Sequence, residues 1–312
     1  MNVKMQKHIL LLADMEGCSG ITDMGQYDIC QERMIEETER VIRLIETYEK
    51  AEISVADCHN DGKNIVKYFS EKGYVCYEHI WFVQSVERYD CAMLIGFHPK
   101  NGEDGFCPHT IRPDVKDLYL GEKSIGEVGL MINWLAGHGV PVVFVSGDSA
   151  VKKELDGYDG EFYATNEKES DDLDRQTLME LMKPYIQRAL GIKDRDILHY
   201  NDHEIRLRLI GEVYNKFVPQ ELFLVREGFI VFPNTESFIL SLLPLCEFLN
   251  IAEEYQRLRI RHLVKKIKKS GVRVEKDRRA NDLLNQKEWR ALSDEEISYL
   301  YKVSQSGQDE VR

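Results

Sequence analysis

Short apolar runs alternate with longer amphipathic stretches in the first half of the chain. Apolar runs of this length, separated by helix-like segments, are typical of a mainly parallel sheet whose faces are covered by helices. The runs that predict strands are His8–Ala13, Ile53–Ala56, Cys91–Ile95 and Val142–Val145. The first half therefore predicts an α/β fold.

Helical periodicity lies between these runs. In Gln31–Lys50, apolar side chains recur every three or four residues, and Glu and Arg are expected on the other faces of the helix. A second helix is predicted at Gly126–Gly137, where glycines bracket an apolar stripe. The segment Val115–Ile125 predicts a hairpin that turns at Gly121.

The pattern changes after Asp148. The acidic stretch Asn166–Asp174 predicts a linker or surface loop. The elements expected beyond it are a helix at Arg175–Leu190, a strand at Ile205–Val213, a β pair at Leu222–Phe232, a helix at Ser237–Leu249 and a charged helical segment from Glu253 onward. We therefore expect an α/β domain at residues 1–155, a smaller α+β domain at 156–252 and a basic helical C-terminal extension at 253–312.

The composition is that of a soluble globular protein. With 43% hydrophobic and 30% charged residues, the chain is neither collagen-like nor wholly disordered. The net charge of −13 disfavours nucleic acid as a partner. Seven cysteines, none in a C-x-x-C spacing, predict no disulfide framework and suit a reducing cytoplasm. The run Ile9–Ala13 is too short for an export signal, and no other stretch is expected to reach membrane-spanning length, so we expect a cytoplasmic protein without a membrane partner.

Metal-ligand side chains follow the strands predicted in the first half. Asp14 and Glu16 follow the first strand at a spacing that lets both carboxylates point to the same side. His59 follows the second strand, His98 follows the third, and Glu127 begins the second predicted helix. Ligands bind at the carboxyl ends of parallel strands, so these side chains are expected to converge. Two histidines and three carboxylates suit a divalent metal, and a shared carboxylate could bridge two ions.

Each of these residues also has an interpretation that needs no metal. Asp14 could cap a helix, and His59 or His98 could be a polar loop residue. Glu127 could complement the dipole of its helix. Convergence of three strands at one edge favours the metal, while spacing alone leaves the two interpretations evenly balanced.

The ordered motifs resemble those of the D-aminopeptidase family, the M55 metallopeptidases. The resemblance covers about His8 to Lys153 and is absent from the last sixty residues. The motifs that carry it are DMEGCSG at 14–20, DCH at 57–59, GFH at 96–98, His109, GEVGL at 126–130 and VSGD at 145–148.

The resemblance implies a dinuclear zinc site, with Mn²⁺, Co²⁺ or Fe²⁺ as alternative metals. Asp14, Glu16 and His98 would hold one ion, and Asp14, His59 and Glu127 the other, with Asp14 as the bridge. His109 lies eleven residues after His98, as the family's catalytic histidine does, and would not be a ligand. It would transfer a proton or stabilise an oxyanion beside a metal-activated water. Without the family spacing, His109 would be interpreted as an exposed loop residue.

The first hypothesis is therefore a zinc-dependent amide or peptide hydrolase, an aminopeptidase that releases small or D-configured N-terminal residues from short peptides. The chain has no G-x-S-x-G, G-x-x-x-x-G-K-[ST] or H-E-x-x-H motif, which excludes the serine-hydrolase, P-loop and zincin classes. One alternative is a metal-dependent hydrolase of a non-peptide amide or biosynthetic intermediate, because Asn166–Asp174 is acidic where the family commonly carries basic residues. Another is a non-catalytic binding or scaffold protein with a vestigial site.

The C-terminal extension is basic although the chain as a whole is acidic. Between Arg257 and Arg279 there are eleven Lys or Arg residues and two acidic residues. M55 relatives form ring-like homo-oligomers, so the resemblance implies a homo-oligomer here. We expect this basic segment to pack against an acidic surface of its own or a neighbouring chain.

Overall fold

The computed structural model describes residues 6–165, 174–192, 200–211, 214, 216–270, 277–285 and 289–306. The chain divides into two compact units, the first comprising Met1–Ile111 and Glu122–His203 and the second comprising Arg112–Gly121 and Glu204–Arg312. This division differs from the boundary expected after residue 155. Strand β8 and helix α4, which follow that point, pair with and pack on the first sheet and so belong to the first unit.

The first unit is built on a six-stranded sheet in the order β3-β2-β1-β4-β7-β8. Its strands are β1 (Lys7–Ala13), β2 (Ala51–Asp57), β3 (Val75–Tyr77), β4 (Cys91–Phe97), β7 (Val142–Gly147) and β8 (Glu161–Ala164). Every neighbouring pair is parallel. The predicted α/β fold is therefore confirmed. The four predicted strands are β1, β2, β4 and β7, and sequence reasoning missed the short edge strands.

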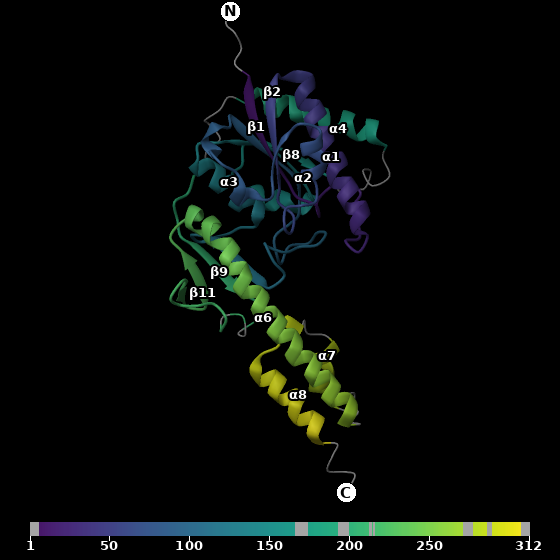
Figure 1. Ribbon diagram of the computed structural model, residues 1–312, viewed down its shortest axis with the longest axis vertical. Helices are drawn as coiled ribbons and strands as arrows, with labels where there is room; N and C mark the ends of the chain where they lie inside the picture. The colour runs from purple at the N-terminus through teal and green to yellow at the C-terminus, as the bar shows by residue number, and fades with distance from the viewer. Residues whose placement is uncertain are drawn as a thin grey trace, which may run out of the picture. The chain divides into compact units, whose positions relative to one another are not determined.

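Helices cover both faces of this sheet (Figure 1). They are α1 (Tyr27–Tyr48), α2 (Val66–Glu71), α3 (Glu127–Gly137) and α4 (Arg175–Gly191). Helices α1 and α4 lie side by side on one face and share a core with the alternate residues Ile9, Leu11 and Ala13 of β1. Helix α3 lies on the opposite face, against β4 and β7.

The buried face of α1 differs from the prediction. Glu37 and Arg40 are buried there together with Met34 and Val41, although Glu and Arg were expected on the other faces. A charged side chain can be buried when it finds polar partners, and Glu37 accepts hydrogen bonds from Ser19 in the loop after β1 and from Ser146 in β7.

Short elements connect the larger ones of the first unit. They are η1 (Ile80–Phe82), η2 (Val86–Arg88), β6 (Lys123–Ser124) and η3 (Ser149–Leu155). Residues 166–173 of the predicted linker lie outside the described residues, and its last residue, Asp174, caps α4 by accepting the N–H groups of Gln176 and Thr177.

The second unit contains an antiparallel sheet in which β10, β11, β9 and β5 are neighbours in that order. These strands are β5 (Val115–Leu120), β9 (Ile205–Leu209), β10 (Leu224–Arg226) and β11 (Phe229–Phe232). The chain leaves β5 through Gly121, whose φ of +58° suits the predicted turn at glycine. The expected α+β character is confirmed, while Glu212 and Val213 of the predicted strand lie outside the described residues.

The described residues near the end of the chain lie mainly in helices, as predicted. The helices are α6 (Thr235–Ser270), α7 (Arg278–Asn285), η5 (Trp289–Ala291) and α8 (Asp294–Ser306). Helix α8 packs along α6 (Figure 1). A small separate core joins these helices through Leu263, Ala280, Leu283, Leu292, Ile297 and Leu300. Helix α6 runs without a break through residue 252, where a domain boundary was expected.

The stretch Thr235–Ile267 of α6 is long and apolar enough, by length and composition, to cross a membrane. The expectation that no stretch reaches this length was wrong, because the helix predicted at Ser237–Leu249 continues into the charged segment. Of its most apolar window, 39% is buried inside the protein. A core helix of a soluble protein meets the same criterion.

Candidate metal centre

The loop after β1 carries Asp14 and Glu16 across the end of β4. The backbone N–H of Asp14 donates to Ile95 O at 2.8 Å, and that of Gly17 donates to Gly96 O at 2.8 Å. A Cβ on Gly17 would lie 1.9 Å from Phe97 O, so only glycine permits this close approach. The first glycine of the DMEGCSG motif thus has a steric role that places both carboxylates at the carboxyl end of the sheet.

A neighbouring carboxylate closes the loop that carries His59. Asp57, the last residue of β2, accepts the N–H of His59 at 3.2 Å and that of Ile65 at 2.8 Å. It also accepts the side-chain amide of Asn64 at 2.9 Å. Burial raises the pKa of Asp57, although these hydrogen bonds oppose that effect. The loop is therefore held from its base, and Nε2 of His59 lies 3.3 Å from Glu16 Oε1.

His98 and His109 present the same ring atom to the carboxylates. The Nδ1 of His98 is 3.0 Å from Pro99 O and that of His109 is 2.9 Å from Cys107 O. A carbonyl only accepts, so each Nδ1 carries the proton and each Nε2 is left for the site. The two rings stack in parallel, with centroids 3.9 Å apart.

Glu127 approaches from the other side, at the first turn of α3. Its Oε1 lies 3.2 Å from His98 Nε2 and accepts the N–H of Ile111 at 2.6 Å. Ile111 has a φ of +65°, which is unusual for a β-branched residue. Backbone strain of this kind persists where surrounding contacts fix it and is frequent at functional sites.

The structure brings the predicted residues together in a partly different grouping. Within the part of the chain that the structure describes, three sets have ligand atoms that all lie within 4.8 Å of one another, namely Asp14/Glu16/His98, His98/His109/Glu127 and Glu16/Cys107/His109. The first set is the one implied for one ion. Among the described residues, the set implied for the second ion does not form such a group, because His59 lies beside Glu16 and Glu127 beside His98.

The Sγ of Cys107 lies within 4.8 Å of ligand atoms of Glu16 and His109. Sequence reasoning did not single out this cysteine. The C-x-H spacing of Cys107 and His109 is the sequence feature that could have drawn attention to it. His109 itself, expected to be catalytic and not a ligand, falls in two of the three sets.

The donor set fits a divalent cation. Asp14 Oδ2, Glu16 Oε2 and His59 Nδ1 are buried and make no hydrogen bond to the described part of the chain. Leaving buried polar atoms without partners is costly, and a cation that takes carboxylate and imidazole ligands would satisfy them. Carboxylate oxygens and histidine nitrogens are ligands that zinc accepts.

The electrostatics show strong coupling within the cluster. Burial raises the pKa of Asp14 well above its usual value, and the charges of Glu16 and Glu127 raise it further. Burial alone would lower the pKa of His98, but Glu127 and Glu16 raise it to about 9. Conversely, His98 lowers the pKa of Glu127 to about 2 against the effect of burial. Perturbed groups of this kind cluster at functional sites.

The parallel sheet and the acid–histidine cluster at the carboxyl ends of its strands define an α/β protein with a candidate divalent-metal centre. The model of the M55 peptidase family, described as D-aminopeptidase, matches residues 7–178 of the 312. The match covers more than half of the chain, and the chain therefore belongs to this family.

Two further comparisons were made with single proteins. The D-aminopeptidase of Bacillus subtilis (strain 168) is 26% identical over 161 residues, which are 47% of this chain and 58% of that protein. The chain thus spans less than two thirds of that relative. The structure of the "Zn-dependent D-aminopeptidase DppA from Bacillus subtilis, a self-compartmentalizing protease" is similar with a TM-score of 0.65 and 19% identity. The similarity covers 77% of this chain and 97% of that one, and it shows a shared fold.

Proposed function

We propose that the protein is a zinc-dependent aminopeptidase that releases small or D-configured N-terminal residues from short peptides in the cytoplasm. The observation that carries this proposal is the convergence of Asp14, Glu16 and His98 at the carboxyl ends of β1 and β4, where their ligand atoms lie within 4.8 Å of one another. Membership of a family described as D-aminopeptidase and the fold shared with a zinc-dependent relative support the activity and the metal.

Five residues would hold two zinc ions, namely Asp14, Glu16, His59, His98 and Glu127, with Mn²⁺, Co²⁺ or Fe²⁺ as alternative metals. Bound there, the ions would activate a water and polarise the scissile carbonyl. Asp57 keeps the His59 loop closed, and the carbonyl of Pro99 fixes the His98 ring so that Nε2 faces the carboxylates.

His109 is proposed to transfer the proton. The bond from its Nδ1 to Cys107 O fixes the tautomer, so the free Nε2 faces Glu16 Oε1 at 3.9 Å. Burial lowers the pKa of His109, but the bond to Cys107 and the charges of Glu127 and Glu16 raise it on balance. A neighbouring base that can hold a proton is the requirement for general acid–base catalysis.

The activity is tested with matched short peptides and acyl amides. The purified protein should hydrolyse D-aminoacyl peptides faster than their L-counterparts, should lose activity with a chelator and should regain it with Zn²⁺. Glu16→Ala should be inactive, while Glu32→Ala, an exposed change on α1, should retain wild-type rates. Turnover of non-peptide amides alone would refute the aminopeptidase assignment, and full activity without metal would refute the metalloenzyme.

The protein is further proposed to form a homo-oligomer through the basic segment Arg257–Arg279. The relative described as self-compartmentalizing supports assembly, and Arg261 and Lys269 are exposed on α6. Part of the segment is engaged in its own chain, because Arg259 lies 2.8 Å from Asp294, and residues 271–276 lie outside the described residues. Light scattering should give a multimeric mass that falls with salt, which screens charges over about 8 Å at physiological ionic strength. A single-chain mass at every salt concentration would contradict this.

A further inference from the structure

Glu37 of α1 is buried behind the loop that carries two of the proposed ligands. Only 1% of its surface is exposed. Its Oε2 accepts the backbone N–H of Ser19 at 2.8 Å, and its Oε1 accepts the hydroxyl of Ser146 at 2.7 Å. Ser19 belongs to the loop of Asp14 and Glu16, and Ser146 lies near the end of β7. One carboxylate therefore joins two strand ends of the candidate centre.

Ser146 extends this network to a third strand end. Its Oγ accepts the N–H of Gly96 at 3.2 Å, two residues before His98. Gly96 has a φ of +70°, and a Cβ there would lie 2.5 Å from Asp14 O. The end of β4 therefore packs against the loop after β1 so closely that no side chain fits at Gly96. The chain of contacts from Glu37 reaches both segments that supply ligands to the group Asp14, Glu16 and His98.

Arg40, one turn along the helix, places a positive charge beside Glu37. Its Nη1 lies 3.7 Å from Glu37 Oε2, and the residue is 6% exposed. That distance makes an ion pair without a direct hydrogen bond, so Ser19 and Ser146 supply the hydrogen bonds that Glu37 accepts. A buried ion pair is weak evidence for stability, because the cost of desolvation can exceed the Coulombic gain.

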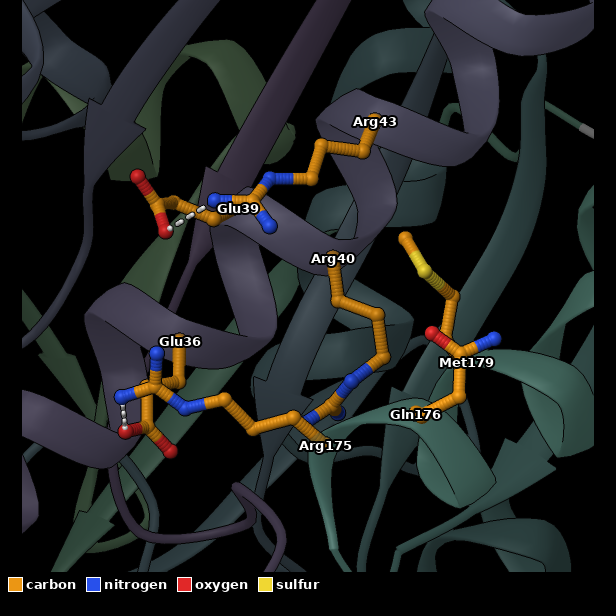
Figure 2. A pocket seen from close by; sticks show the side chains of 7 residues that line it. All are labelled: Glu36, Glu39, Arg40, Arg43, Arg175, Gln176 and Met179. Atoms are coloured by element: carbon orange, nitrogen blue, oxygen red, sulfur yellow. Dashed lines mark hydrogen bonds and ion pairs between the residues drawn. The ribbon is translucent and has the colours of Figure 1, made fainter.

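The neighbouring glutamate shows the contrast on the same helix. Glu36 lines a pocket between α1 and α4 and pairs with Arg175 there, while Arg40 lies at the same pocket (Figure 2). Glu36 also pairs with Arg33 at 3.0 Å. Two glutamates adjacent in sequence therefore have different hydrogen-bond partners, since Glu36 accepts from Arg33 and Arg175 while Glu37 accepts from Ser19 and Ser146 in the interior.

We propose that Glu37 is a positioning residue for the metal centre. It fixes Ser19 and Ser146 so that Asp14 and Glu16 are held at ligand distance from His98 before the ion binds. The inference rests on the proposed function in that the centre must bind a metal. Partners that orient ligands without touching the ion typically change metal affinity by about 10- to 100-fold when they are lost.

The test compares Glu37→Gln with its matched control Glu36→Gln. Glutamine keeps the size of the side chain but carries no charge, and its amide nitrogen cannot accept the hydrogen bond that one of the two carboxylate oxygens accepts now. Zinc affinity is measured on metal-free protein by competition with a chromophoric chelator. We expect Glu37→Gln to bind zinc about 10- to 100-fold more weakly and Glu36→Gln to bind like wild type. The visible spectrum of the Co²⁺-loaded protein should change in Glu37→Gln only.

A structural role alone would lower the melting temperature of the metal-free protein and leave zinc affinity and the Co²⁺ spectrum unchanged. That result would overturn the proposal. If Glu37→Gln does not fold, Ser146→Ala takes its place, because it removes the hydroxyl between Glu37 and Gly96. A folded Ser146→Ala with wild-type affinity and spectrum would overturn the proposal equally. If wild-type protein binds no divalent metal, the proposed function fails as well, which distinguishes that outcome from failure of the Glu37 inference alone.

Discussion

Two regions of the molecule use charged residues in opposite ways. One is the candidate metal centre of the first unit, called the metal end below, and the other is the group of C-terminal helices in the second unit. At the metal end, Asp14 and Glu16 are buried, and each has an oxygen without a hydrogen bond to the described residues. In the C-terminal helices, charges pair in partly exposed positions, such as Arg259 with Asp294 at 2.8 Å and Arg290 with Glu253 at 2.9 Å. There the stability comes from a separate apolar core, because exposed ion pairs contribute little.

The difference shows which charged residues indicate a functional site. Burying a charge without a full set of partners is unfavourable, so a cluster of such groups indicates a ligand or a reaction. Paired charges on a helix surface indicate solubility or weak contacts instead. The family match at residues 7–178 contains the whole metal end and none of the C-terminal helices.

The largest effect, on zinc affinity, is expected when a histidine of the metal end is replaced by alanine and compared with the same replacement on α6. His98→Ala removes a ligand candidate that contacts Asp14 and Glu127, and it should lower zinc affinity by more than the roughly 100-fold known for orienting partners. His262→Ala, an exposed change on α6, should alter neither metal content nor rate. Isothermal titration with zinc and a peptide assay on both variants check this. Equal zinc binding by the two variants would contradict the assignment of the metal site to the first unit.

His109→Ala should separate chemistry from metal binding. Loss of general acid–base catalysis typically costs about 10²- to 10⁴-fold in rate, so the turnover number should fall by that range while zinc content stays unchanged. Metal content and steady-state rates are measured on the same preparation. If zinc is lost together with activity, His109 is a ligand, as its place beside Glu127 and Cys107 would also allow.

Leu263→Ala should affect stability and leave the chemistry unchanged. Leu263 is fully buried in the core that joins α6 to the last helices, and such a truncation costs about 2–5 kcal/mol. Hydrogen exchange should become faster in α7 and α8 while peptidase activity stays at the wild-type level. The control is Leu258→Ala, whose side chain is 54% exposed. A loss of activity in Leu263→Ala would show that the two regions are coupled.

The smallest effect is expected from the surface pair. Arg259→Gln removes the contact with Asp294 and should change the free energy of unfolding by about 0–1 kcal/mol. Denaturant unfolding measures it. A change as large as that of Leu263→Ala would mean that charge, and not the apolar core, holds these helices.

Local patterns made much of the fold predictable. The four central strands and α3 carry continuous apolar runs or stripes, and Gly121 marks its turn by residue type. The edge strands β3 and β8 have only three and four residues, too few for a periodic pattern to appear. The length of α6 was missed because its charged half resembles a separate segment, although α8 packs along it.

The sequence indicated which residues would meet in the candidate site, but not how their side chains are arranged. Strand ends in a parallel sheet meet at one edge, which was enough to bring Asp14, Glu16 and His98 together. The contacts of His59 with Glu16 depend on loop conformation, which the strand pattern does not specify. Glu37 could not be found at all, since a glutamate in an amphipathic helix is expected to face solvent and Ser146 lies 109 residues away.

The zinc content of the purified protein tests the central claim most directly. Metal-free protein is dialysed to equilibrium against buffered zinc and analysed by mass spectrometry of the metal, with Glu16→Ala in parallel. The account predicts about two zinc ions per wild-type chain, the number for a two-metal site, and a clear loss in the variant. A wild-type chain that retains no zinc, or a variant that retains as much as wild type, would contradict it.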